Sequence, residues 1–130
     1  MDIISEELNK LKLQKKIDKL VKKYKNKKVM LYGAGRYFDA ISENFDLSGF
    51  NIIGISDSRF DSNTLEYKGF KTFAPAKIKE QNPDIVLICN YDAEVIEDYF
   101  EDFLFPQYGK FKYKSILEAS IWECLFDLFG

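Results

Sequence analysis

Three short apolar segments do most to limit what this 130-residue chain can fold into. They cover residues 28–32, 50–56 and 84–89. Runs this short, bounded by glycine or polar residues, are typical of strands rather than of buried helices. The stretch from Ile85 to Cys89 is continuous and rich in β-branched residues, as expected at the centre of a parallel sheet. The sequence therefore predicts a sheet whose central strands are buried on both faces.

The segments that follow the strands carry apolar residues at helical spacing. Residues 36–45 form one such segment. Residues 92–104 form another, with Asp92 as the expected N-cap and Pro106 and Gly109 as the expected end. The inward face of this second helix is predicted to hold Val95, Ile96, Tyr99, Phe100, Phe103 and Leu104. Strands that alternate with helices predict right-handed β-α-β units and a mainly parallel sheet covered on both faces.

Weaker signals complete this pattern. They are a short strand at 70–73, a helix from Pro75 to about Gln81, a last strand at 112–115 and an irregular stretch at 60–69. We therefore predict a Rossmann-like three-layer α/β/α fold with a mainly parallel sheet of about five strands. The length suits one domain over residues 1–130, with its α/β core at 28–115.

Both ends of the chain differ in character from this core. Residues 1–26 are predicted to form an amphipathic helix from Ser5 to Tyr24, and the first 30 residues carry ten lysines against four acids. Such a helix can contact nucleic acid or an acidic membrane, but the lack of an arginine cluster favours a solvated face and no nucleic-acid partner. Residues 116–130 predict an apolar helix that mediates self-association or docking on a partner protein, or else covers the sheet with Trp122 buried.

The composition excludes several kinds of chemistry. The chain has no histidine, and Cys89 and Cys124 lie far apart without a CxxC motif. A zinc site, a Cys-His nucleophile and a Ser-His-Asp triad are therefore not expected, and we predict no catalytic residue and no metal ligand. No run of 18 apolar residues and no signal-peptide pattern is present, so we expect a cytoplasmic protein without a membrane span.

The motif Gly33-Ala34-Gly35 is the strongest candidate for a binding site. It follows a predicted strand and opens a predicted helix, the context in which a G-x-G pattern is informative. Glycines allow a tight turn and close approach of a phosphate to the free N–H groups of the helix. The alternative is a simple strand-to-helix turn. Phe38 stands where a third glycine would fall, and its bulk is expected to hold the helix away from the strand and to disfavour ordinary dinucleotide binding.

Further candidate residues follow the ends of the predicted strands. Asp57 lies 24 residues after Gly33, near the position of an acid that binds ribose hydroxyls, but it can equally form a turn with Ser58. Arg36 and Arg59 are candidates to flank a phosphate or a second anionic group, with solvated arginines as the alternative. The remaining candidate binding residues are Tyr37 and Ser58 beside them, and Asn90 and Tyr91 for contact with a base or sugar. All of them are expected at the carboxyl edge of the sheet, where open α/β sheets bind ligands.

A family resemblance is carried by four segments: Val29 to Gly35, Gly49 to Asp57, Tyr67 to Thr72 and Asp84 to Ile88. Their order resembles the Rossmann-like N-terminal domains of bacterial sugar-modifying enzymes of polysaccharide synthesis, both sugar-nucleotide acetyltransferases and membrane-linked dehydratases and epimerases. The resemblance implies that Gly33, Gly35 and Asp57 contact a nucleotide sugar or NAD. The chain lacks the hexapeptide repeats of the acetyltransferases and the catalytic domain of the dehydratases.

Three functions remain open from the sequence. The first is a nucleotide or nucleotide-sugar binding module of glycan synthesis without catalysis of its own. The second is a small NAD(H)-dependent enzyme or sensor, although 130 residues leave little room for a substrate-binding half. The third is an interaction module in which the α/β core is only a scaffold.

Overall fold

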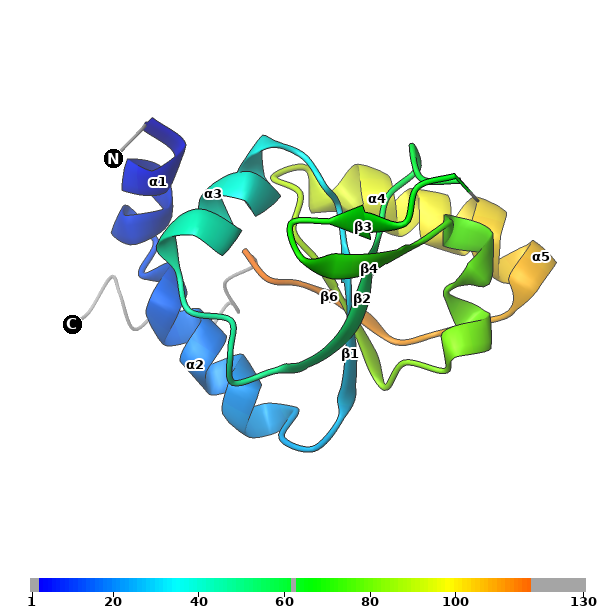
Figure 1. Cartoon of the computed structure of the whole chain (residues 1–130), viewed down its shortest axis with the longest axis horizontal. Helices are drawn as coiled ribbons and strands as arrows, with labels where there is room; N and C mark the ends of the chain where they lie inside the picture. The colour runs from blue at the N-terminus through cyan, green and yellow to red at the C-terminus, as the bar shows by residue number, and fades with distance from the viewer. Residues whose placement is uncertain (1–2, 62, 118–130) are drawn as a thin grey trace.

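The computed structural model describes residues 3–61 and 63–117, and it contains a six-stranded sheet in the order β3-β4-β2-β1-β5-β6 (Figure 1). The strands are β1 (Lys28–Tyr32), β2 (Asn51–Ser56), β3 (Glu66–Tyr67), β4 (Phe70–Phe73), β5 (Ile85–Ile88) and β6 (Tyr113–Ser115). Every pairing is parallel except that of β3 with β4. This is the predicted Rossmann-like α/β arrangement, and the strands expected from the short apolar runs are confirmed.

Strand β1 lies at the centre, between β2 and β5, and its residues alternate between two apolar cores. Val29 and Leu31 face one core, whereas Met30 and Tyr32 face the other. All four are nearly inaccessible to solvent. Since successive side chains of a strand point to opposite faces, burial on both faces requires the continuous apolar run seen in the sequence.

Helices cover both faces of the sheet. Helices α1 (Ile3–Lys10), α2 (Leu13–Lys23) and α3 (Arg36–Asn44) contribute to the first core. The second core lies under a continuous helical segment made of α4 (Ala93–Tyr99), the π-helix η3 (Phe100–Leu104) and α5 (Phe105–Tyr108). At its centre the ring of Phe100 makes edge contacts with those of Tyr32, Phe111 and Tyr113.

The expected single helix from Ser5 to Tyr24 is wrong. The chain breaks between α1 and α2 at Lys12, which adopts a left-handed conformation with φ 56°. The break lets Leu8 and Leu13 both enter the core, while Leu11, part of the expected apolar stripe, stays 46% exposed. Ser5, the expected first residue of that helix, is instead a buried residue within α1, and its Oγ accepts a hydrogen bond from Asn44 Nδ2 at 2.8 Å.

The hairpin that joins β3 to β4 was not expected, because residues 60–69 were predicted to be irregular. Lys68 and Gly69 both have positive φ, 52° and 86°, which is the geometry of a two-residue hairpin turn. The turn pairs Tyr67 with Phe70 and adds a sixth strand to the predicted five. The expected helix after Pro75 is also wrong, since it is replaced by two 3-10 turns, η1 (Pro75–Lys77) and η2 (Lys79–Gln81).

The helical segment after β5 differs from the prediction in where it ends and in which of its side chains face inward. Pro106 does not end the helix, which continues to Tyr108 and stops at Gly109, where φ is 98°. Proline has no N–H to donate, and the preceding π-turn has a longer hydrogen-bonding period than an α-helix. This change of period explains why Phe103, which was expected to face inward, is 51% exposed. Val95 was also expected to face inward and is 58% exposed.

Two further sequence expectations concern the ends of the chain and membranes. No helix within residues 3–61 and 63–117 is long and apolar enough to cross a bilayer. The predicted C-terminal helix lies outside the described residues beyond Leu117, as do Trp122 and Cys124.

The break between α1 and α2 predicts that two lysine-to-glycine substitutions change the stability in opposite directions. Lys12→Gly should raise the free energy of unfolding by about 1 kcal/mol, because glycine adopts the left-handed conformation without steric cost. Lys15→Gly, in the first half of α2, should lower it by about 0.5–1 kcal/mol. Urea unfolding of both variants measures the difference, and a loss of stability in Lys12→Gly would contradict the strained break.

Candidate nucleotide-binding site

The candidate site lies at the carboxyl ends of β1 and β5, where the connections that follow the two strands lead to opposite sides of the sheet. β1 continues into α3 and then β2 on one side, whereas β5 on the other side continues into α4. The two helices belong to opposite cores, so the loops after β1 and β5 diverge to opposite faces of the sheet. In open α/β sheets this reversal creates the crevice in which ligands bind. The Gly33-Ala34-Gly35 turn and Asn90 lie on its two sides.

Gly33 is required by the close packing of these two loops. Its φ is 105°, its N–H donates to the Ser56 carbonyl oxygen at 2.8 Å, and a Cβ atom built on it would lie 1.9 Å from Asn90 Oδ1. Asn90 therefore lies across the turn. Its buried Oδ1 accepts no hydrogen bond within the described part of the chain, and neither does the buried Oγ of Ser56, a residue that sequence reasoning missed.

Gly35 has a different environment. Its φ of −108° and ψ of −159° suit any residue, and a Cβ atom there would meet nothing within 4 Å in the described part of the chain. Gly35 is also the N-cap of α3 and provides no side-chain oxygen to its first turn. Because the first N–H groups of a helix have no partner inside it, the start of α3 presents donors to open space. This is the geometry that a phosphate needs.

Asp57 holds the glycine turn. Its Oδ2 accepts the Ala34 N–H at 2.8 Å, and its Oδ1 accepts the backbone N–H and Nε of Arg59 at 3.0 and 2.9 Å. Arg59 Nη2 in turn donates to the Ala34 carbonyl oxygen at 2.5 Å. Burial raises the pKa of Asp57, but the hydrogen bonds from Arg59 and Ala34 outweigh it and leave the pKa below its ordinary value. Asp57 and Arg59 thus clasp the turn.

This clasp favours the turn-forming interpretation of Asp57. Its carboxylate is 10% exposed, and both oxygens already accept hydrogen bonds from the protein. Ser58 lies between the two residues of the clasp, and its contact with a ligand stays a prediction. Contact of Asp57 with a ribose stays a prediction, as does contact of Arg36, which is exposed in the first turn of α3, with a phosphate.

Tyr37 and Tyr91 meet at the mouth of the crevice. Their rings stack with centroids 5.3 Å apart and an interplanar angle of 23°, and Tyr91 is 70% exposed. Phe38, next to Tyr37, is fully buried and packs beside the rings of Tyr67 and Phe70 of the β3–β4 hairpin. The residue in place of the third glycine is therefore part of the first core, and its predicted effect on dinucleotide binding remains a prediction.

The described residues offer little for covalent or metal chemistry. Among residues 3–61 and 63–117, no group of three or more His, Cys, Asp or Glu side chains could hold a metal ion. Cys89 is buried at the end of β5, and burial raises the pKa of its thiol to about 12. A thiol with this pKa is protonated near neutrality and is a poor nucleophile.

The strand order, the two-sided core and the reversal between β1 and β5 define a Rossmann-like α/β domain. Residues 25–102 match the C2185-like, N-terminal family, and the chain belongs to that family. No curated protein matches the chain.

One solved structure that resembles the chain is a crystal structure of RSP in complex with beta-NAD+ and operator DNA. The similarity covers 86% of this chain and 60% of that chain, with 17% sequence identity and a TM-score of 0.44. This chain thus spans less than two thirds of its neighbour. A likeness of this strength carries no argument about a ligand, and the expectation that this chain binds no nucleic acid stays a prediction.

The contact between Gly33 and Asn90 predicts a non-additive pair of substitutions. Gly33→Ala should lower the free energy of unfolding by about 3 kcal/mol, through backbone strain and a clash with Asn90. Combining it with Asn90→Gly should restore part of the loss, because the clash disappears while the strain remains. Urea unfolding of the single and double variants measures both effects, and strict additivity would contradict the contact.

The lowered pKa of Asp57 predicts an acid-sensitive contribution to stability. The contribution is fully present above the unfolded-state pKa of about 4 and is lost as the pH falls through the lower folded-state pKa. Asp57→Asn should therefore destabilise the protein most at pH 7, and its deficit relative to the wild type should shrink on acidification. Glu80→Gln, at an exposed carboxylate paired with Lys77, is the control and should show no such trend.

Proposed function

We propose that this chain is a nucleotide-binding module that holds a phosphate of its ligand at the start of α3. The observation that carries the proposal is the open space at Gly35, above a helix terminus without a side-chain cap. Gly33 and the Asp57–Arg59 clasp fix the turn beneath this space. The protein therefore loses little conformational freedom when a phosphate binds, which favours affinity.

The ligand that we propose is a nucleotide sugar, and the process that it serves is bacterial glycan synthesis. The resemblance of the four sequence segments to sugar-nucleotide binding domains supports this choice. Phe38 in place of a third glycine disfavours the close helix packing of ordinary dinucleotide sites, so NAD(H) is the second choice. We propose no catalytic step, because the described groups at the crevice are suited to binding and orienting a ligand.

The proposal is tested at Gly35, where an added Cβ atom would meet none of the described residues within 4 Å. Gly35→Val should weaken nucleotide binding at least tenfold, because its methyl groups would fill the space above the α3 N–H groups. Gly35→Ala should have an intermediate effect. The thermal midpoint should fall by only a few degrees, since valine is a poorer N-cap than glycine.

The measurement is a thermal-shift panel of NAD, UDP-sugars, coenzyme A and S-adenosylmethionine, followed by titration of whichever compound stabilises the protein. A ligand that binds only the folded state raises the midpoint with its concentration. Undiminished affinity in a folded Gly35→Val protein would mean that the phosphate binds elsewhere. If no compound of the panel raised the thermal midpoint, the proposal of a nucleotide ligand would be wrong.

A further inference from the structure

A groove of about 870 Å³ opens beside the candidate site, between α1 and the start of α4. Its apolar lining comes from Leu8 of α1, Leu11 just after α1, Ala93 of α4 and Leu117 after β6. The volume lies within the range of small-molecule sites, roughly 300–1,000 Å³. Leu11 is 46% exposed, so apolar surface in this groove is open to a ligand.

The charge of the groove is strongly negative. Among the described residues, the carboxylates of Glu7, Asp92, Glu94 and Glu97 line it, and Lys10 contributes an ammonium group. Asp92 and Glu94 also suit the positive start of α4, but Glu7 belongs to the opposite wall, on α1. A concave surface with this excess of negative charge repels a phosphate and concentrates cations.

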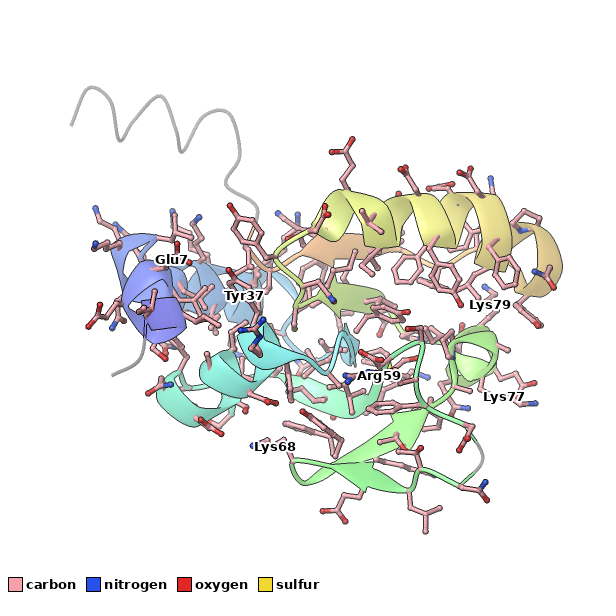
Figure 2. All side chains as sticks on the ribbon, turned by 90° about the horizontal axis from the view of Figure 1, so that it is seen from above. Glu7, Tyr37, Arg59, Lys68, Lys77 and Lys79 are labelled. Carbon is pink, nitrogen blue, oxygen red and sulfur yellow. The ribbon has the colours of Figure 1, made fainter. Side chains whose placement is uncertain are left out.

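Two aromatic rings add a second attraction for a cation. Tyr37 and Tyr91 both line the groove and stack on each other. Glu7 and Tyr37 lie close together in Figure 2, and burial together with the nearby Glu7 carboxylate raises the pKa of the Tyr37 hydroxyl. The electron-rich faces of tyrosine rings attract ammonium groups, and quaternary ammonium groups in particular bind among aromatic side chains.

The groove and the proposed phosphate position are contiguous. Tyr37 is the second residue of α3, so its backbone N–H belongs to the helix start while its ring lines the groove. Tyr91 directly follows Asn90, which lies across Gly33. A ligand of nucleotide size therefore reaches from the glycine turn into the groove.

We propose that the groove between α1 and α4 binds the positively charged end of the ligand. Together with the phosphate position at α3, on which this extension of the proposed function rests, the groove selects a nucleotide joined to an amino sugar or a quaternary amine. The positive start of α3 takes the anionic part, and the carboxylates with Tyr37 and Tyr91 take the cationic part. A nucleotide joined to a neutral sugar gains nothing from these groups.

The groove itself is tested with choline and its uncharged isostere 3,3-dimethylbutan-1-ol, in which carbon replaces nitrogen. With the full, ¹⁵N-labelled chain, choline should shift the amide signals of Tyr37, Tyr91 and Ala93. It should bind about tenfold more tightly than the isostere, and added salt should reduce this preference. Equal binding of both compounds, or shifts confined to other parts of the protein, would overturn the inference.

Charge-removing variants locate the effect. Glu7→Gln combined with Glu94→Gln keeps the shape of both walls and should reduce the preference for choline to about twofold or less. Tyr91→Ala should also lower choline affinity, and Tyr91 is exposed enough for the fold to tolerate its loss. Glu80→Gln is the matched control, because its partner Lys77 lies far from Glu7 in Figure 2. A preference that survives in the double variant would also overturn the inference.

The link to the phosphate position is tested with UDP-glucosamine and UDP-glucose at about pH 6, where the amine is protonated. UDP-glucosamine should bind about tenfold more tightly, and Glu7→Gln with Glu94→Gln should remove the difference without weakening UDP-glucose. Equal affinities would overturn the extension but leave the proposed function standing. Choline binding by a protein that binds no compound of the nucleotide panel would overturn the proposed function and leave the cation groove standing.

Discussion

Burial of β1 on both faces is the constraint from which the rest of the structure follows. Val29 and Leu31 anchor the core that holds α1, α2 and α3, while Met30 and Tyr32 anchor the core under α4 and η3. Both helical layers thus depend on four consecutive residues of one strand. The turn that follows this strand is fixed from both sides, and it is the place where a ligand site can be built with little motion.

The site shows how one short motif divides into two roles. Gly33 serves the fold, since positive φ and the contact with Asn90 leave no room for a side chain. Gly35 serves no packing need among residues 3–61 and 63–117, because its backbone suits any residue and a Cβ atom there would touch none of them. A glycine that the protein does not need for its own structure is informative about function, whereas Gly33 would be required in any version of this fold.

The sequence predicted α3 and every described strand except β3, because their signals are local: short apolar runs, glycines and helical periodicity. It failed at Lys12, where a break without glycine or proline interrupts a regular apolar pattern, and at Phe103, whose direction depends on a π-turn. For the site, the sequence placed Asp57 and Asn90 at the carboxyl edge. It could not show that Arg59 binds Asp57 rather than facing a ligand, because that contact depends on side-chain geometry across two loops.

The contact of Asn90 with Gly33 also connects the two halves of the crevice mechanically. The loop that carries Gly33 leads into α3, and the loop that carries Asn90 leads through Tyr91 into α4. With no room for even a methyl group between them, neither loop can shift without displacing the other. A movement of either loop toward the other is therefore transmitted through this contact, and any coupling between groups bound at the starts of the two helices would by thermodynamic linkage be equal in both directions.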